Sequence, residues 1–186
     1  MDNIQVRFVT SNPFKAAEAQ EILGPIGVRV VPIEMKIEEL QTTDTHRLVR
    51  DKAVRAFANI ARPLFVEHTG LYLKYMNDLP GGLTQIVWDA LQADRFSELF
   101  GKSPDPRVTA KTTIGYIDGK KVHIFLGEIS GRVAAKPIGN RDFQWDCVFV
   151  PDGETETFAQ MGSRKNKISM RRRALDQYAA FLQANR

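Results

Sequence analysis

Residues 10–15 (TSNPFK) combine residue types that could bind phosphate. Asn12 is a favoured helix N-cap, and Pro13 suits the first helical position. The free backbone N–H groups at a helix N-terminus carry partial positive charge, to which Lys15 would add a full charge. The segment therefore predicts a phosphate site. A well-capped structural helix would show the same pattern, and the glycines of a Walker loop are missing.

Three glutamates near predicted strand ends, Glu38, Glu39 and Glu67, could bind a divalent cation. Ligand sites in α/β proteins form at strand ends, and Mg²⁺ usually takes one or two protein carboxylates together with phosphate and water. We therefore predict Glu39 and Glu67 as metal ligands for Mg²⁺, with Mn²⁺ as a second candidate. Exposed glutamates that bind nothing are also common.

The segment FQWD, which begins at Phe143, alternates aromatic and polar side chains. In an extended strand, Phe143 and Trp145 would share one face and could stack on a purine, while Asp146 could accept hydrogen bonds from the base edge. Two core aromatics on a strand would give the same pattern. Further along the chain, Lys165 and Arg171 could bring positive charge to a phosphate or a base.

The elements that would position these side chains alternate between strand and helix, which indicates the α/β class. Strands are predicted over residues 4–10, 28–33, 64–67, 71–75, 108–117, 121–126, 128–134 and 143–150. Helices are predicted over residues 13–23, 48–60, 83–100 and 174–182, with Asp44 or Thr45 as the cap of the second. Asp118 and Gly119 indicate a hairpin turn. We predict one mixed α/β domain over residues 1–186, with two lobes, flanking helices and a central cleft.

The composition is that of a globular protein, with 43% hydrophobic and 26% charged residues in a chain of 186. Apolar runs stay shorter than the roughly 20 residues that a membrane helix needs, and the N-terminus lacks the pattern of a secretory signal. Cys147 is the only cysteine, which excludes a disulfide within the chain. We therefore expect a cytoplasmic protein without a membrane partner.

The formal net charge of +4 is unevenly distributed. Basic residues cluster near the C-terminus at Arg164, Lys165, Lys167, Arg171, Arg172 and Arg173. Such a cluster could meet a polyanion, so nucleic-acid binding is one alternative function. A recognised nucleic-acid-binding module does not accompany it, and a solvated basic face explains it equally well. We expect no nucleic-acid partner.

The order and spacing of these motifs along nearly the whole chain resemble the inosine-triphosphate pyrophosphatase family, which hydrolyses noncanonical purine nucleoside triphosphates. The motifs are TSNPFK at residues 10–15 with Glu18, ELQ at 39–41, KA at 52–53, VEHTGL at 66–71, LPG at 79–81, GEISG at 127–131, DFQWD at 142–146, PDG at 151–153, TFAQM at 157–161, KN at 165–166 and SMR at 169–171.

The resemblance implies a homodimer with a nucleotide cleft that uses Mg²⁺ to hydrolyse ITP, dITP or XTP to the monophosphate and pyrophosphate. It implies that Glu39 helps to place the metal and that Phe143 stacks on the base. The other substrate-binding residues would be Thr10, Ser11, Asn12, Lys15 and Lys52 at the triphosphate, with Thr69, Trp145, Asp146, Lys165 and Arg171 completing the phosphate and base contacts.

The sequence departs from the family pattern most strongly at His68, where the family has an aspartate that activates the attacking water. Histidine can accept a proton near neutral pH but is a poor ligand for Mg²⁺. We therefore predict His68, Lys15 and Glu39 as the catalytic residues, while strand alternation would direct Glu67 to the opposite face. The sequence also has Gln144 in place of a glycine, Gln160 in place of a glutamate and Met170 in place of a histidine. Two functions stay open: a pyrophosphatase with altered activity, and a noncatalytic nucleotide-binding or sensor protein on the same fold.

Overall fold

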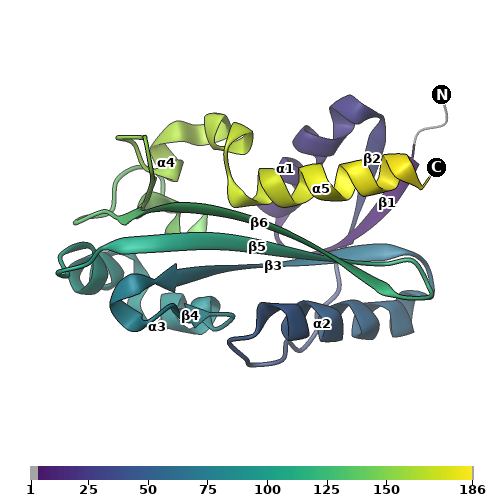
Figure 1. Ribbon diagram of the computed structural model, residues 1–186, viewed down its shortest axis with the longest axis horizontal. Helices are drawn as coiled ribbons and strands as arrows, with labels where there is room; N and C mark the ends of the chain where they lie inside the picture. The colour runs from purple at the N-terminus through teal and green to yellow at the C-terminus, as the bar shows by residue number, and fades with distance from the viewer. Residues whose placement is uncertain (1–3, 186) are drawn as a thin grey trace.

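The computed structural model describes residues 4–185, in which seven strands form one mixed sheet (Figure 1). The strands are β1 (Ile4–Val9), β2 (Val28–Ile33), β3 (Leu64–Leu73), β4 (Leu79–Gly81), β5 (Arg107–Ile117), β6 (Val122–Val133) and β7 (Phe149–Pro151). Their order is β2-β1-β3-β5-β6-β7, and β4 pairs with β3 beside this path. β1 is parallel to β2 and β3, whereas the other pairs are antiparallel. The predicted α/β class with a mixed sheet is confirmed.

Helices cover both faces of this sheet. The α-helices are α1 (Pro13–Leu23), α2 (Thr45–Ile60), α3 (Thr84–Phe96), α4 (Phe158–Met161) and α5 (Met170–Ala184). Shorter helical turns are η1 (Gly24–Ile26), η2 (Lys74–Met76), η3 (Ser97–Gly101), η4 (Gln144–Cys147) and η5 (Gly162–Lys167). α1 and α5 lie on one face and α2 on the other (Figure 1). Among residues 4–185, no helix is both long enough and apolar enough to cross a bilayer.

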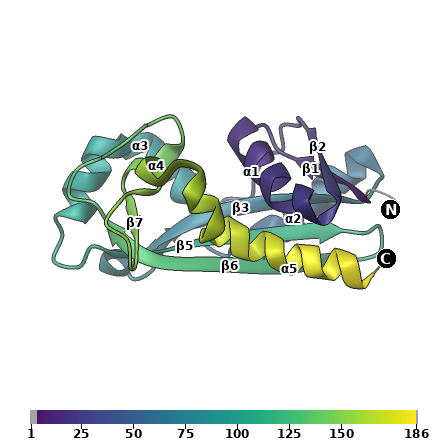
Figure 2. The same ribbon diagram turned by 90° about the horizontal axis from the view of Figure 1, so that it is seen from above.

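The helices gather at the two ends of the long strands, which divides the molecule into two lobes (Figure 2). β1, β2, α1 and α2 form one lobe, and α3, α4 and β7 form the other. The strands β3, β5 and β6 extend through both lobes. The predicted hairpin joins β5 to β6, where Asp118 Oδ1 accepts hydrogen bonds from the backbone N–H groups of Lys120 and Lys121 at 2.7 and 2.9 Å.

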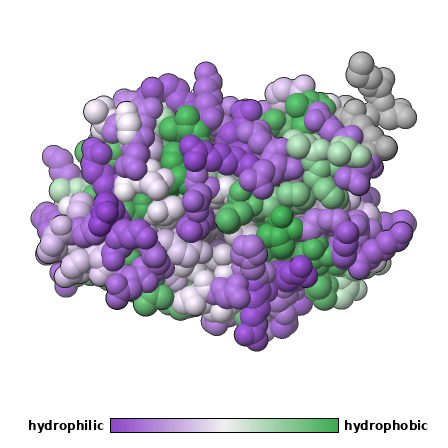
Figure 3. Space-filling model, viewed as in Figure 1, coloured by the Kyte–Doolittle hydropathy of each residue, from purple (hydrophilic) through white to green (hydrophobic). Residues whose placement is uncertain are grey.

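Buried apolar side chains form three clusters that hold these layers together. One lies in the lobe of α3 and η4 around Trp88, Phe96 and Phe149. The other two lie on opposite faces of the sheet, beneath α1 and α5 and beneath α2. Hydrophilic side chains cover much of the face seen in Figure 3, as expected for a chain whose apolar residues are largely buried.

Several predicted elements have different bounds in the structure. The two strands predicted at 64–67 and 71–75 are one strand, β3, because the intervening residues pair with β5 in continuous register from Leu64 to Leu73. β6 likewise replaces two predicted strands. Gly127, within β6, allows α5 to pack directly on the strand, because a Cβ at this position would come 2.0 Å from the Met170 carbonyl oxygen. β4 follows η2 in a segment for which the sequence predicted no strand.

The strand predicted over residues 143–150 is wrong in its first half. Residues Gln144 to Cys147 form the turn η4, and only Phe149–Pro151 pair with β6. Gln144 has a φ of 43°, in the left-handed region, which breaks the extended conformation. Phe143 and Trp145 therefore do not share one face of a strand. The helix predicted over 83–100 is also interrupted, by a non-helical Gln92, and ends in η3.

Candidate active site

The N-terminus of α1 borders a polar cavity of about 260 Å³. The Asn12 side chain caps α1 by accepting a hydrogen bond from the Lys15 backbone N–H at 3.2 Å, and the Thr10 hydroxyl accepts one from the Asn12 backbone N–H at 3.1 Å. These contacts fix the turn between β1 and α1, as the sequence predicted. The cavity is lined by Thr10, Ser11, Asn12 and Lys15 on this side, and by Glu39, Lys52, Gln85 and Gln144 around them. The structure thus brings together the residues predicted to hold a triphosphate.

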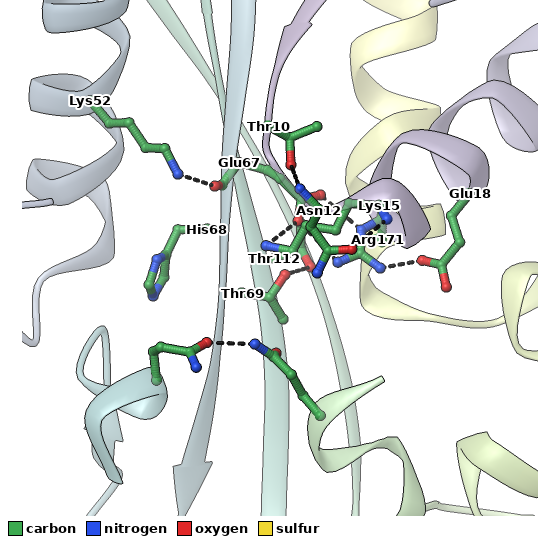
Figure 4. Close-up of polar contacts among 12 residues, drawn as sticks. Thr10, Asn12, Lys15, Glu18, Lys52, Glu67, His68, Thr69, Thr112 and Arg171 are labelled. Carbon is green, nitrogen blue, oxygen red and sulfur yellow. Dashed lines mark hydrogen bonds and ion pairs between the residues drawn. The ribbon is translucent and has the colours of Figure 1, made fainter. Parts of the chain in front are cut away.

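A largely buried network of three carboxylates and three cations lies next to this cavity. Figure 4 shows four of its members, Lys15, Glu18, Glu67 and Arg171. Arg171 Nε and Nη2 donate to the Glu67 carboxylate at 2.8 and 2.9 Å, and Lys15 Nζ lies 3.0 Å from the same carboxylate. Glu18 forms ion pairs with Arg171 and with Lys165, the latter at 2.6 Å. Lys165 also pairs with Asp146. Each buried charge therefore has a partner, which burial requires.

The network shifts the pKa values of its members. Burial raises the pKa of Glu67, but the adjacent Arg171 and Lys15 outweigh burial and hold it well below its usual range. Burial lowers the pKa of Lys15, although Glu67 opposes this. Burial also raises the pKa of Asp146 to about 6, despite the attraction of Lys165.

Glu39, Lys52 and His68 form a second group. Figure 4 shows Lys52 and His68 of this group on the other side of β3 from Lys15 and Arg171. Lys52 Nζ lies 2.5 Å from Glu39 Oε1 and donates a longer hydrogen bond, of 3.3 Å, to the Glu67 carbonyl oxygen. His68 Nδ1 lies 3.5 Å from Glu39 Oε2. Burial raises the pKa of Glu39, but contacts with His68 and Lys52 lower it to about 2. Glu39 is therefore ionised at neutral pH.

His68 is 93% buried, with a relative exposure of 7%, and lines an inner cavity of about 210 Å³ together with Thr69, Trp88 and Trp145. Its Nε2 has no hydrogen-bond partner among the described residues. An imidazole nitrogen in that position can accept a proton or bind a ligand that enters the cavity. His68 and Glu67 are consecutive in β3 and contact different groups, so the predicted alternation of their side chains is confirmed.

The two predicted metal ligands are not equivalent in the structure. Glu67 is turned into the buried network by Arg171 and Lys15 and does not lie beside Glu39. Within residues 4–185, no three His, Cys, Asp or Glu side chains come together in an arrangement that could hold a metal ion. Glu39 alone supplies a carboxylate to the phosphate cavity, which fits Mg²⁺, since Mg²⁺ takes few protein ligands and completes its shell with phosphate and water.

Phe143 lies between the two lobes, where the base was predicted. Its ring packs against Phe14, with centroids 5.3 Å apart, and Lys165 Nζ lies 4.2 Å from its centroid. A small cavity of about 10 Å³ is lined by Lys15, Thr69, Phe143, Gln144, Trp145, Asp146, Met170 and Arg171. Trp145 is buried against Phe149. The predicted base-binding residues thus lie close together. Phe143, Asp146 and Lys165 also line a larger cavity of about 240 Å³, which Phe14 borders from α1.

Sequence reasoning missed Gln85, Thr84 and Trp88, which α3 brings to the inner cavity. No local motif distinguishes them, because the sequence of α3 has the pattern of an ordinary amphipathic helix.

The basic cluster near the C-terminus does not form the single exposed face that the sequence suggested. Lys165 and Arg171 are buried, and Arg164 and Arg172 pair with Glu156 and Asp176. The cluster is therefore divided between the buried network and the surface.

A sequence model of the Ham1 family matches residues 6–181. The chain belongs to the Ham1 family. It is 31% identical to a dITP/XTP pyrophosphatase of Thermococcus kodakarensis, with 98% of this chain and 99% of that protein aligned. It is 33% identical to an inosine triphosphate pyrophosphatase of Yarrowia lipolytica, with 96% of each chain aligned.

Solved Ham1 structures share this fold. A HAM1 protein from Coxiella burnetii superimposes with a TM-score of 0.80 at 21% identity and covers 97% of this chain and 99% of its own. The Ham1 protein of Staphylococcus aureus gives a TM-score of 0.77 at 22% identity, with 98% of this chain and 100% of that chain covered. The resemblance drawn from the sequence motifs is therefore confirmed at the level of family and fold.

Proposed function

We propose that this Ham1-family protein hydrolyses noncanonical purine nucleoside triphosphates, such as ITP, dITP and XTP, to the monophosphate and pyrophosphate. The observation that carries the proposal is the polar cavity in which the N-terminus of α1 meets Lys15, Lys52 and Glu39, next to Phe143. The names of the relatives support the same reaction and substrate class.

The triphosphate would be held by the backbone N–H groups and side chains of Thr10, Ser11 and Asn12, together with Lys15 and Lys52. Both lysines are paired with carboxylates, Lys15 with Glu67 and Lys52 with Glu39. Lys52 would exchange its contact with Glu39 for a phosphate oxygen, so that substrate binding releases the Glu39 carboxylate. Positive charge from the two lysines would then offset the charge that develops on the leaving pyrophosphate.

Glu39 is the residue that would hold a divalent metal, because its carboxylate faces the phosphate cavity and stays ionised. Mg²⁺, or Mn²⁺ in its place, would supply positive charge and orient the phosphate oxygens when bound. Glu67, the other predicted metal ligand, would not bind the metal, because its carboxylate is paired with Arg171 and Lys15.

His68, whose side chain lines the inner cavity, would accept a proton from the attacking water through Nε2, which has no hydrogen-bond partner among the described residues. The water oxygen forms a bond to the α-phosphorus, and the bond from that phosphorus to the bridging oxygen breaks as pyrophosphate leaves. Glu39, 3.5 Å from Nδ1, would stabilise the protonated imidazole that results. His68 would thereby replace the carboxylate that the family pattern has at this position.

The base would stack on Phe143 after that ring moves away from Phe14 and Lys165. Trp145 and Asp146 would line its pocket, with Thr69 at its edge. Lys165 and Arg171 would contribute through the buried network, because their charges are already shared with Asp146, Glu18 and Glu67.

The test is release of pyrophosphate by the purified protein with Mg²⁺ or Mn²⁺ and a panel of ITP, dITP, XTP and the four common ribonucleoside triphosphates. We expect release from at least one deaminated purine nucleotide. The replacement of the family aspartate by His68 favours a second candidate, a nucleotide sensor that binds without turnover. Tight binding of ITP by calorimetry with no pyrophosphate release from any nucleotide would establish that alternative.

The variant His68→Asp separates the two candidates further. A large gain in turnover would identify the natural protein as impaired or repurposed, whereas a loss would give His68 a working role in catalysis. We also propose, from the family resemblance, that the protein is a homodimer of the cytoplasm. Light scattering after size-exclusion chromatography and cell fractionation would test these two properties.

A further inference from the structure

Gln144 occupies a junction between three cavities of the cleft. It lines the phosphate cavity with Asn12 and Lys52, the inner cavity with His68, and the small cavity at Phe143. Lys15 is the other residue common to all three. The side chains of Gln144 and Lys15 therefore lie where the predicted base site and the predicted phosphate site meet.

The covalent order of a nucleotide decides what must lie at this junction. Its base and its phosphates are joined through the sugar, so a base at Phe143 and phosphates at Asn12 place the sugar between them. Lys15 is charged and lies at the phosphate side, against the N-terminus of α1. Gln144 is neutral and carries both a donor and an acceptor, which are the groups that bind a hydroxyl.

The Gln144 amide is held in one orientation by neighbouring side chains. Its Nε2 donates a hydrogen bond to Gln85 Oε1, and Gln85 Nε2 in turn donates to Asp89 Oδ1 at 2.7 Å. Asp89 can only accept when ionised, so it sets the direction of the whole chain of hydrogen bonds. The second N–H and the Oε1 of Gln144 then stay available for a ligand.

The backbone at Gln144 is also unusual for a residue with a side chain. Its φ of 43° lies in the left-handed region, which is unfavourable for a residue with a Cβ. Glycine would fit this conformation without that cost. A glutamine at this position indicates that its side chain has a function, because strained backbone conformations are common at functional sites.

We propose that Gln144, oriented by Gln85, hydrogen-bonds the 2′-hydroxyl of the bound nucleotide and makes the protein prefer ribonucleotides to 2′-deoxyribonucleotides. The inference rests on the proposed function, because it needs a nucleotide in the cleft. A ribonucleotide satisfies the oriented amide, whereas a 2′-deoxyribonucleotide displaces water from it without replacing the hydrogen bond. The penalty for leaving such a group unsatisfied corresponds to roughly a tenfold difference in affinity.

The test compares the affinities of IMP and dIMP, measured by calorimetry, for the natural protein and for three variants. Gln144→Gly removes the side chain at a position whose φ suits glycine, so the fold is retained. Gln85→Ala removes the residue that orients Gln144. Gln183→Ala, on the exposed face of α5, is the matched control.

We expect the natural protein and Gln183→Ala to bind IMP about tenfold more tightly than dIMP. We expect this ratio to fall to within about twofold in Gln144→Gly and to fall in Gln85→Ala, since an unoriented amide discriminates less. Equal binding of IMP and dIMP by the natural protein, or an unchanged ratio in Gln144→Gly, would overturn the inference.

The monophosphates also separate this inference from the proposed reaction. They are the products, so their binding does not depend on turnover. If the protein binds IMP tenfold more tightly than dIMP, loses this preference in Gln144→Gly and releases no pyrophosphate, the inference is supported and the proposed hydrolysis is refuted. If the protein releases pyrophosphate but binds IMP and dIMP equally, the proposed hydrolysis is supported and the inference is refuted.

Discussion

Replacing Arg171 by methionine should strongly destabilise the folded protein. The Arg171 and Glu67 side chains are each only 2% exposed, and Arg171 also pairs with Glu18. The substitution keeps a long apolar side chain but leaves two buried carboxylates with less compensating charge. Breaking a buried ion pair by removing one partner costs about 3–5 kcal/mol, which is a large part of a typical domain stability of about 5–15 kcal/mol.

Urea denaturation at pH 7, followed by circular dichroism, would measure this loss as a lower transition midpoint. For a chain of this size, the corresponding fall in Tm is about 6–20 °C. Arg107→Met is the matched control, because Arg107 forms an ion pair with Asp105 on the surface, where its side chain is 73% exposed. Solvent screens that pair, so its loss should change the midpoint far less.

A double-mutant cycle with Glu67→Gln tests whether the effect comes from the ion pair. The coupling free energy between the two substitutions should lie within the range of about 0.5–3 kcal/mol seen for contacting residues. The reasoning is refuted if Arg171→Met lowers stability no more than Arg107→Met, or if the cycle gives additive effects. Either result would mean that burial does not strengthen the ion pairs between Arg171 and the two glutamates.

Three further predictions concern the catalytic group and the packing of α5. His68→Ala should lower kcat for the best substrate by about 10²–10⁴-fold with little change in KM, whereas the exposed His46→Ala should leave both constants unchanged in the same steady-state assay. Glu39 has a folded pKa of about 2, below its ordinary value of 4.5, so its ionised form stabilises the fold. The stability advantage of the natural protein over Glu39→Gln should therefore be present above pH 4.5 and disappear as the pH falls towards 2, and Tm values that differ equally at both ends would contradict this. Gly127→Ala should cost about 1–3 kcal/mol, because its Cβ would lie 2.0 Å from a backbone oxygen of α5. Gly24→Ala, whose Cβ would meet the Gln20 side chain at 2.8 Å and no backbone atom, should cost less in the same denaturation experiment.

The fold could be predicted from the sequence wherever local signals were strong. The helix at Pro13–Leu23 and the strand at Val28–Ile33 have the predicted bounds, and Asn12 caps α1 as expected. The hairpin at Asp118 is also correct. These features depend on residues within a few positions of one another, so the sequence contains the information needed to predict them.

The errors occurred where long-range pairing overrides local composition. The polar residues in the middle of β3 interrupted its apolar pattern, yet pairing with β5 keeps the strand intact through Gly70. Conversely, Phe143 to Cys147 has a strand-like composition but folds as a turn, because the left-handed Gln144 breaks the extended path. Periodicity alone cannot anticipate either outcome.

The sequence by itself determined the family, the α/β class and which residues gather around the cleft, since capped helix ends and ordered motifs are local properties of the chain. Only the tertiary structure decided how these side chains are paired. Glu67 and Arg171 are 104 residues apart, and Glu18 and Arg171 are 153 apart. The sheet brings these groups together out of water, and burial then requires each charge to find a partner. That requirement, which no local pattern expresses, makes Glu67, predicted as a metal ligand, the partner of Arg171 and Lys15. The structure also shows that the His68 side chain lines the inner cavity and that its Nε2 has no hydrogen-bond partner among residues 4–185.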